Sequence, residues 1–507
     1  MSSPSDKQRV PSHAVIFALF LGEVLLMLLM QLPGVADFQK FGFYDEGAWL
    51  HLDRLFAGGA RPTIDVGYSY GALPLLLTRA WCAAVGRTPW AFIGFVTVCN
   101  IGSAWGLARV FHATGTTWLR LAVACVLLPL AIMPNAYSLM HPLEMVLLIA
   151  ALAQQARGRY GGALAFATLA VLTKPSMGYV LGLLLLVLAA WLRKGWRVVL
   201  PPAVAGAAAI GVAVGILGVR PAIANILPVT GGKSYQQMDF GIFHAGMSFW
   251  AHGGTLLGMV DYYFRTPALF WIAGSICLWV LGVLALMRLC IARPGAADAA
   301  AKPRVRPTDA LVATIAIMHA AFVFAFYAWS GSWTYYSYLL VAGLVIGLRG
   351  TRSIRALMVF ALLGIVGLNG RWNDAFSRWM GMVRSPEVGG LWIYPDVLED
   401  AREVRELARK HKTLYMVNGA LPTIWPEAQT PPSWFLSPGI PTEEELQKTN
   451  AQLAAADLVI LCADYDTKQE AWSWPQFKAQ REQFGEQPLL KNKHFEVYAR
   501  KAPASQN

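Results

Sequence analysis

The chain has 507 residues, of which 56% are hydrophobic and only 14% charged, with a net charge of +12 and a mean hydropathy of +0.45. Soluble globular proteins carry about 25% charged residues, so a chain this poor in charge must contain long segments buried in lipid. Its Lys and Arg residues lie in short loops between apolar runs, as the positive-inside rule predicts. Composition therefore indicates a polytopic membrane protein and excludes nucleic-acid binding as the reason for the positive charge.

The six cysteines form no CxxC pair and no Cys/His cluster, which argues against a zinc or iron–sulfur site. Five of them lie in or beside apolar segments. Only Cys462 lies in the polar C-terminal part, so no disulfide is expected within that part. Residues 1–10 are polar and basic, and the apolar run after them is full length without a cleavage site. We interpret this run as a retained first span rather than a signal peptide.

Apolar runs in residues 1–368 predict about eleven membrane spans, because a span needs about 20 apolar residues. The expected spans are 13–32, 91–111, 119–136, 143–155, 161–172, 176–191, 198–217, 269–290, 309–328, 335–348 and 354–368. The run 72–86 is short and contains Arg79. We interpret it as an interfacial or re-entrant helix.

Loop charge predicts the orientation of these spans. Basic loops occur at 109–120, 157–159, 193–197, 288–306 and 349–355. The alternate loops, 34–71, 134–142, 173–175, 220–263 and 331–334, carry carboxylates, aromatics and glycines but few cations. The alternation places the N-terminus in the cytoplasm and the C-terminal part outside it, provided that 72–86 does not cross the membrane.

Residues 369–507 predict one small α/β domain. Helices are expected at 396–411, 442–456 and 474–484, and strands at 413–417, 458–462 and 494–498. The segment 421–441 is rich in Pro, Trp and Ser and predicts a long irregular loop. No GxxxxGK[ST] or GxGxxG motif occurs here, so no nucleotide site is predicted.

The first long loop carries adjacent carboxylates at Asp45 and Glu46 and a third at Asp65. Between them, an apolar face formed by Trp49, Leu52, Leu55 and Phe56 predicts a short amphipathic helix on the membrane surface. The two adjacent carboxylates could also be solvated or cap this helix. The glycine, proline and aromatic residues of the loop instead favour a specified shape.

The pattern Asp45-Glu46-Gly47, Gly58…Arg61-Pro62…Asp65…Tyr68-Ser69-Tyr70-Gly71-Ala72-Leu73-Pro74 resembles the first external loop of GT-C glycosyltransferases. These multi-span enzymes use polyprenyl-phosphate sugars and include protein mannosyltransferases and bacterial aminoarabinose and arabinofuranosyl transferases. The segment Leu172-Thr173-Lys174-Pro175 and a soluble domain after the last span are also similar to that group. Members often carry an Arg-Pro-Asp triplet near the external end of the third span, where this chain has His141-Pro142-Leu143-Glu144.

The resemblance implies a GT-C-like helical bundle over 1–368, with external loops at 34–71 and 220–263, and an extracytoplasmic α/β domain over 369–507. It implies an enzyme of the bacterial inner (plasma) membrane that moves a sugar from a polyprenyl-phosphate donor to a glycan, lipid or protein acceptor by inverting displacement. By resemblance, Asp45 is the candidate base and Glu46 its helper or an ion ligand. Candidates for acceptor or ion binding are Asp65, Tyr68, Tyr70, His141 and Glu144. Candidates for the donor phosphate are Lys174 and, more weakly, Lys233, Tyr235 and Gln236. A divalent cation is left open.

A transporter or lipid-carrier flippase is the alternative from another class. Transporters place ionisable residues within their spans near the membrane midplane. The predicted spans of this chain contain almost none, and Glu23 in the first span is the clear exception. Lys174 could equally be a lysine that snorkels to the interface. The clustering of polar residues on one side of the membrane favours an interfacial enzyme.

Overall fold

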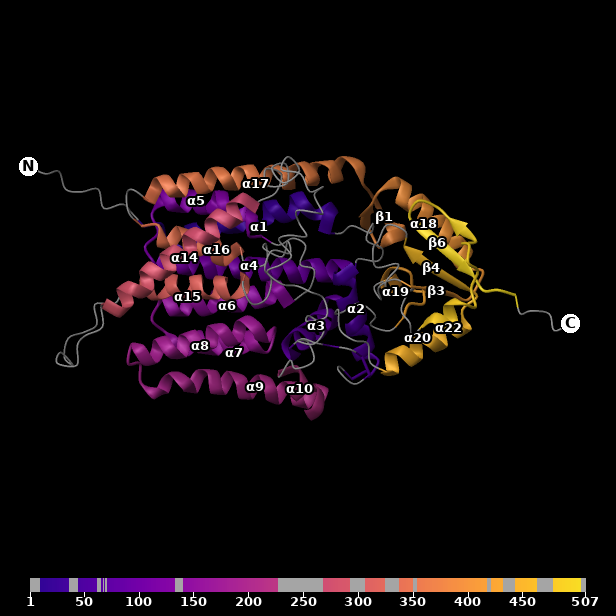
Figure 1. Ribbon diagram of the computed structural model, residues 1–507, viewed down its shortest axis with the longest axis horizontal. Helices are drawn as coiled ribbons and strands as arrows, with labels where there is room; N and C mark the ends of the chain where they lie inside the picture. The colour runs from indigo at the N-terminus through magenta and orange to yellow at the C-terminus, as the bar shows by residue number, and fades with distance from the viewer. Residues whose placement is uncertain are drawn as a thin grey trace, which may run out of the picture.

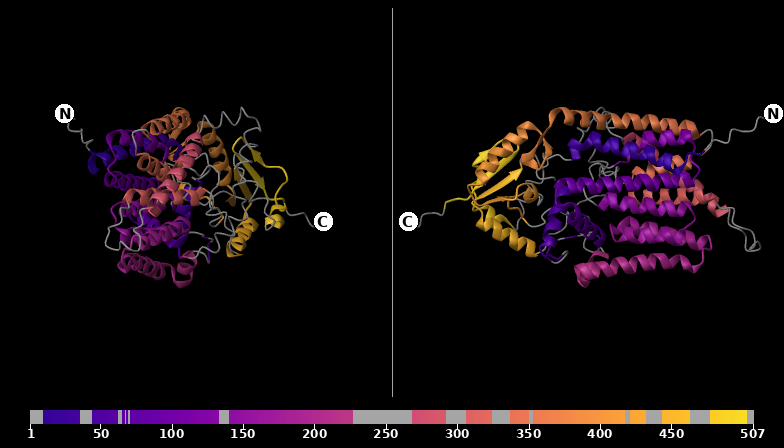
Figure 2. Two further views of the ribbon diagram at one scale, coloured as in Figure 1. Left: turned by 60° about the vertical axis from the view of Figure 1, so that its left-hand side comes forward. Right: turned by 180° about the vertical axis from the view of Figure 1, so that it is seen from behind.

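The structure is a computed structural model that describes residues 10–35, 44–61, 65–66, 68, 71–132, 140–226, 268–291, 306–323, 337–349, 353–416, 421–431, 443–462 and 477–502. These residues form a bundle of long helices with a small α/β domain at one end (Figure 1). Two further views show the same separation (Figure 2). The predicted fold class, a polytopic helical membrane protein with a small C-terminal α/β domain, is confirmed. We call the end of the bundle that faces the α/β domain the domain end.

Each predicted span contains a helix. The helices are α1 His13–Val35, α4 Pro89–Ala113, α5 Trp118–Leu127, α6 Met140–Ala156, α7 Tyr160–Val171, α8 Pro175–Trp191, α9 Leu200–Leu217, α14 Ala268–Ile291, α15 Pro307–Ala321, α16 Ser337–Gly347 and α17 Ser353–Gly381. Within the described ranges, five segments are long and apolar enough to cross a membrane: His13–Gly34, Pro89–Ala113, Trp196–Leu217, Leu269–Ile291 and Ser353–Gly381. Other apolar helices have 10–17 residues, so eleven spans remains a prediction.

The helix starts follow from local sequence. At the start of α4 the Thr88 hydroxyl accepts a hydrogen bond from the backbone N–H of Ala91, at 3.2 Å. Pro89 occupies the first turn, where backbone N–H groups have no partner within the helix. The missing N–H of proline therefore costs no hydrogen bond there. Helices α8, α9 and α15 also begin with proline in the first turn. These prolines define the point where each basic or polar loop gives way to a helix.

Neighbouring helices approach closely where one of them has a glycine. A Cβ placed on Gly282 of α14 would lie 2.3 Å from the Ala316 Cβ of α15, and one on Gly106 of α4 would lie 2.8 Å from Ile149 of α6. Small residues serve this purpose in membranes, where van der Waals packing holds helices together.

Buried hydrogen bonds add to this packing. The Tyr338 hydroxyl of α16 donates to Asn100 Oδ1 of α4 at 3.1 Å. The Gln155 amide of α6 donates to Thr314 Oγ1 of α15 at 2.8 Å. Each of these bonds joins helices that are far apart in the sequence, so they fix the order in which the helices pack.

Helix α17 connects the bundle to the α/β domain. It has 29 residues, a length of about 43 Å at 1.5 Å per residue, which exceeds the roughly 30 Å hydrocarbon core of a bilayer. The eleventh span was expected to end at Leu368, yet the helix continues to Gly381. The predicted domain boundary at 368/369 therefore falls within a helix. Beside it, the Trp379 indole N–H donates to the Met30 carbonyl of α1 at 2.7 Å.

The α/β domain is built on a four-stranded sheet in the order β3-β4-β6-β5. The strands are β3 Thr413–Tyr415, β4 Leu458–Cys462, β5 Leu490–Lys491 and β6 Phe495–Ala499, and the pair β3–β4 is parallel while the other two pairs are antiparallel. Every residue of β4 is buried, as expected for a central strand covered on both faces. The three predicted strands are confirmed. A short hairpin of β1 Val383–Ser385 and β2 Leu391–Ile393 precedes the sheet.

The helices of this domain are α18 Pro395–Ala408, α19 Leu421–Ile424, α20 Glu443–Ala455 and α22 Lys478–Arg481. The predicted helices at 396–411 and 442–456 are confirmed as α18 and α20. Within the described residues, the third predicted helix is reduced to α22. The segment 421–441 was expected to be irregular throughout, but its first four residues form α19. A leucine, a proline and an isoleucine in this short helix bring an apolar surface to the bundle.

The domain contacts the bundle through tryptophans. The Trp392 ring of β2 lies edge-on to Trp90 at the start of α4 and to Trp379 of α17, with centroid distances of 5.8 and 5.7 Å. The Trp90 indole N–H donates to the Gly389 carbonyl at 3.3 Å. The Arg384 guanidinium lies 5.1 Å from the centre of the Trp90 ring. We call Trp90, Trp379, Trp392 and Arg384 the tryptophan junction.

Candidate active site

Two segments singled out by sequence, the loop that ends at Gly71 and the turn before α8, are in direct contact at the domain end. The Gly71 N–H donates to the Thr173 carbonyl at 3.0 Å, and the Leu73 N–H donates to the Leu172 carbonyl at 2.9 Å. These bonds join the start of α3, Ala72–Val85, to the residues that precede Lys174. The two parts of the proposed motif therefore form one structural unit.

Only a glycine fits at position 71. A Cβ built on Gly71 would lie 1.9 Å from the Leu172 carbonyl oxygen and 2.8 Å from the Thr173 nitrogen. Both neighbours are backbone atoms, so no side-chain rotation could make room. Glycine is used where two backbones approach this closely, and here it permits α3 to begin against the turn that carries Lys174.

The side chain of Tyr68 is hydrogen-bonded to the backbone of Gly71. Its hydroxyl donates to the Gly71 carbonyl at 2.7 Å, and its ring lies edge-on to Trp49 with a centroid distance of 6.0 Å. Burial raises the pKa of the Tyr68 phenol, so the hydroxyl stays protonated and donates at neutral pH. The side chain thereby fixes the shape of the loop, and its predicted role in acceptor binding stays a prediction.

Lys174, His141 and Glu144 are buried together at the domain end, and we call them the Lys174 cluster. Lys174 directly precedes α8, whereas His141 and Glu144 lie three residues apart on one face of the first turns of α6. The exposed fractions are 7% for Lys174, 7% for His141 and 0% for Glu144. Three side chains that can carry charge are thus removed from water at one end of the bundle.

Within the cluster, Lys174 Nζ lies 3.5 Å from His141 Nδ1. A lysine ammonium can only donate hydrogen bonds, so in this contact His141 Nδ1 accepts and the neutral imidazole carries its proton on Nε2. The lysine is therefore oriented by the imidazole. The structure brings these three predicted residues together, and their roles toward a donor or an acceptor stay predictions.

The carboxylate of Asp65 forms a salt bridge with Arg61. Its Oδ2 accepts from the Arg61 backbone N–H at 2.8 Å and from Nε at 2.9 Å, while Oδ1 accepts from Nη2 at 2.8 Å. The Arg61 guanidinium holds the pKa of the Asp65 carboxyl well below its usual range. Asp65 is thus ionised with both oxygens in use, and an acceptor or cation would have to share them with Arg61.

Asp45 and Glu46 lie in the first turn of α2, Tyr44–Ala57. Their side chains fall outside the described residues, as do Tyr70, Lys233, Tyr235 and Gln236. The predicted base and the weaker phosphate contacts are therefore untested. Among the residues that the structure describes, no group of three or more His, Cys, Asp or Glu side chains is arranged to hold a metal ion.

The sequence matches no protein-family model and no curated protein. Among solved structures, the chain is similar to the crystal structure of ArnT from Cupriavidus metallidurans bound to undecaprenyl phosphate. The two sequences are 13% identical, the match covers 95% of this chain and 97% of that chain, and the TM-score is 0.40.

Helix α2 is fixed from several sides by residues that sequence analysis did not single out. The carboxylate of Asp53, whose side chain is 2% exposed, accepts from Arg87 Nε at 2.6 Å. Arg54 Nη1 donates to the Pro422 carbonyl of α19, at 3.5 Å. Leu50 and His51 are buried along with the expected Trp49, Leu52 and Phe56. The helix is thus packed between α3, α4 and α19, whereas its sequence predicted one buried face and one solvated face.

Proposed function

We propose that the protein is a membrane glycosyltransferase that transfers a sugar from a polyprenyl-phosphate donor to an acceptor on the extracytoplasmic face. The observation that carries the proposal is the contact of Gly71 with Thr173. It ties the loop that follows Asp45 and Glu46 to the buried Lys174 cluster, at the one end of the bundle that the α/β domain covers.

The reaction is a single displacement at the anomeric carbon. The acceptor hydroxyl loses its proton to the Asp45 carboxylate, and its oxygen forms a bond to that carbon from the face opposite the phosphate. The bond between the anomeric carbon and the phosphate oxygen breaks with its electron pair, and the polyprenyl phosphate leaves. Inversion at the anomeric carbon follows, since one displacement occurs.

The leaving phosphate gains negative charge in the transition state and needs a positioned cation. Lys174 supplies this cation, and His141 orients it at 3.5 Å. Lys174 is removed from bulk water, and a charge acts more strongly in such a buried site than in solvent. Burial at the end of the helices suits a donor whose hydrocarbon tail stays in the bilayer.

The test is sugar transfer by purified protein in vesicles, with donors chosen by profiling lipid-linked glycans in a strain that lacks the protein. We expect Asp45→Asn to keep the melting temperature of the wild type and to lose at least about 100-fold in transfer rate. We expect a similar loss for Lys174→Met. Wild-type rates in Asp45→Asn would overturn the assignment of the base.

Matched controls separate catalysis from folding and from transport. Lys194→Met removes an exposed lysine at the opposite end of α8 and should leave transfer unchanged. Glu23→Gln, within α1, should also transfer at the wild-type rate. The transporter would be favoured if the wild type transferred no sugar but moved a substrate across the membrane, and Glu23→Gln lost that movement.

The orientation is tested by cysteine labelling. Leu489 of the α/β domain is 60% exposed, and a Leu489→Cys variant should react with an impermeant reagent added outside intact cells. Cys290, exposed at the end of α14, is replaced by serine in this background so that it adds no signal. Labelling only after the cytoplasmic side is opened would overturn the proposed side of the reaction.

A further inference from the structure

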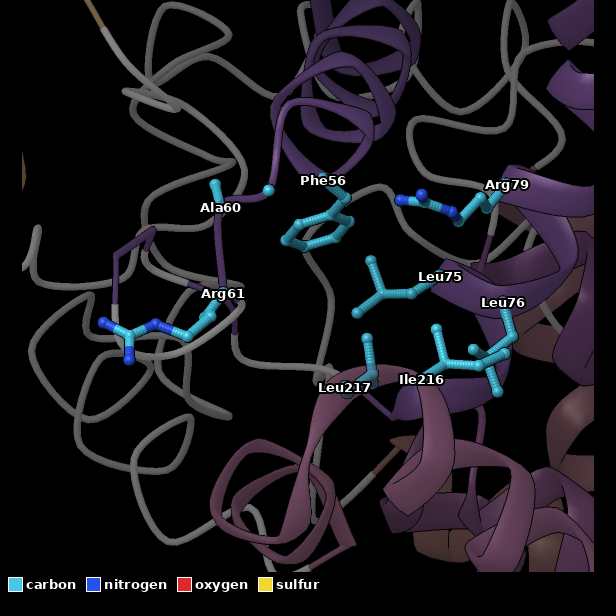
Figure 3. Close-up of a pocket in the computed structure, with 9 residues that line it drawn as sticks. Phe56, Ala60, Arg61, Leu75, Leu76, Arg79, Ile216 and Leu217 are labelled. Atoms are coloured by element: carbon cyan, nitrogen blue, oxygen red, sulfur yellow. The ribbon is translucent and has the colours of Figure 1, made fainter.

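A cavity of about 150 Å³ lies between the end of α2, the middle of α3 and the end of α9. At roughly 30 Å³ for each water, this volume suits a small polar group but not a whole lipid. Its walls combine two arginines, Arg61 and Arg79, with several apolar side chains, namely Phe56, Leu75, Leu76, Ile216 and Leu217 (Figure 3). We call it the Arg79 pocket.

Arg79 is the free positive charge of this pocket. Figure 3 shows its guanidinium directed toward the ring of Phe56, over the leucines of α3. Arg79 makes no hydrogen bond or salt bridge with any residue that the structure describes. The second arginine of the wall, Arg61, points away from the other lining side chains and is neutralised by Asp65. No carboxylate occurs among the described residues that line the pocket, so Arg79 gives this part of the wall a net positive charge.

The apolar wall of the pocket continues onto the lipid-facing surface of the bundle. Ile216 is 56% exposed, and Val212 and Val204, one and three turns earlier in α9, are 53% and 59% exposed. Only 6% of the apolar stretch in Trp196–Leu217 is buried within the protein, and α9 forms one edge of the bundle in each view (Figure 1 and Figure 2). A hydrocarbon chain can therefore lie along α9 with its head at Arg79.

A close fit between α3 and α9 keeps the pocket in shape. Ala72 of α3, Ala213 of α9 and Ala222 of α10, Val219–Ile226, form a small buried cluster. Their short side chains allow the helices to cross closely beside the cavity. Because α3 begins at the Gly71 contact, the pocket is joined through one helix to the turn that carries Lys174.

We propose that the Arg79 pocket binds the phosphate headgroup of a membrane lipid, with Arg79 as the phosphate ligand and the lipid chain along α9. A soluble phosphate would gain the charge interaction alone, whereas a lipid gains burial of its chain as well. The site is separate from Lys174, and its occupancy does not require sugar transfer.

Native mass spectrometry of the full-length protein in detergent tests the proposal, with one lipid added at a time. The probes are phosphatidylglycerol, phosphatidylcholine, a polyprenyl monophosphate and diacylglycerol, which has the chains without the phosphate. We expect phosphate-bearing lipids to be retained and diacylglycerol not. Preference for phosphatidylglycerol identifies a bilayer lipid as the source, and preference for the polyprenyl phosphate identifies the carrier lipid. Equal retention of diacylglycerol would overturn the role of the phosphate.

Two variants and a control localise the binding. Arg79→Gln should weaken retention by about tenfold or more, because a charge-assisted hydrogen bond to the phosphate is lost. Ile216→Trp should weaken it by filling the cavity while the charge remains. Arg220→Gln removes an exposed arginine of α10 that does not line the pocket and should retain lipid as the wild type does. Unchanged retention in both Arg79→Gln and Ile216→Trp would place the lipid elsewhere.

Discussion

The backbone nitrogen of Gly71 lies 3.0 Å from the carbonyl oxygen of Thr173. A Cβ at position 71 would lie 1.9 Å from the carbonyl oxygen of Leu172, so this position has no room for a side chain. We predict that Gly71→Ala lowers the stability of the protein by about 3 kcal/mol, because a methyl group would overlap backbone atoms that can move only with α3 or α8. Transfer activity should fall with it, since the turn carrying Lys174 would shift. Thermal unfolding in detergent and the transfer assay measure the two effects.

Gly182→Ala is the matched control for that substitution. Gly182 lies in α8 itself, and a Cβ there would meet no heavy atom within 4 Å. Alanine favours a helix over glycine by up to about 1 kcal/mol, so this variant should be as stable as the wild type or slightly more so. Equal stability and activity of both variants would show that the Gly71 contact is not required.

The sequence predicted the elements around this contact but not the contact itself. Each helix of the bundle was predicted because its apolar residues form one continuous run, which is a local signal. The end of α17 was missed because Asn369, Arg371 and Asp374 end the apolar run, although the helix continues to Gly381. Hydropathy detects where a helix leaves lipid, not where the helix ends.

A second prediction concerns the salt bridge between Asp53 and Arg87. Arg87→Ala should lower stability by about 2 kcal/mol, since it leaves the carboxylate of Asp53 buried without its cation; this is less than for a fully enclosed pair because Arg87 is 36% exposed. The double variant Asp53→Asn/Arg87→Ala should recover most of the loss, and a double-mutant cycle on unfolding free energies measures the coupling.

An exposed ion pair in the same protein provides the comparison. Arg402 and Glu387 have side chains that are 55% and 41% exposed, and exposed pairs contribute about 0–1 kcal/mol. Arg402→Ala should therefore change stability little. If Arg87→Ala were equally mild, the buried pair would not be what fixes α2 to the start of α4.

The buried His51 predicts a dependence of stability on pH. Its side chain is 7% exposed, and neither ring nitrogen has a hydrogen-bond partner among the described residues. Burial, aided by the nearby Arg54, lowers the pKa of His51 from 6.5 to about 4. Below pH 6.5 the unfolded chain binds a proton that the native protein does not. This contribution to stability is thus complete above pH 6.5 and is lost as the pH falls toward 4, by up to about 3 kcal/mol.

Thermal unfolding between pH 7.5 and pH 4.5 measures that loss. His51→Phe should lose less stability over this range than the wild type, since no imidazole remains to be protonated. Leu50→Ala, a truncation of the neighbouring buried side chain, should lower stability by a similar amount at every pH. The same pH dependence in His51→Phe and the wild type would assign the acid sensitivity to other groups.

The candidate site was only partly predictable from the sequence, because part of it is created by helices that pack together from distant parts of the chain. Its residues on one helix face, such as His141 and Glu144, follow from spacing. The burial of His51 and Asp53 does not, because it depends on α3, α4 and α19 packing around α2. The Arg79 pocket is likewise assembled from three helices whose order in space no local pattern contains. Arg79 was noticed only as a charge that interrupts an apolar run.

The last prediction concerns the tryptophan junction between the bundle and the α/β domain. Trp392 is 9% exposed and contacts the rings of Trp90 and Trp379. Trp392→Ala should destabilise the attachment by about 3 kcal/mol, because it removes a large buried ring and leaves a cavity. Hydrogen exchange should rise in β1, β2 and the end of α17 while the helices far from the domain keep their protection. Trp372→Ala, which removes a half-exposed ring elsewhere on α17, should leave exchange in β1 and β2 as it is in the wild type. If both variants raised exchange equally, the domain would be held by its connection through α17 and not by the junction. If only Trp392→Ala raises exchange, the contacts of Trp392 keep the domain over α2.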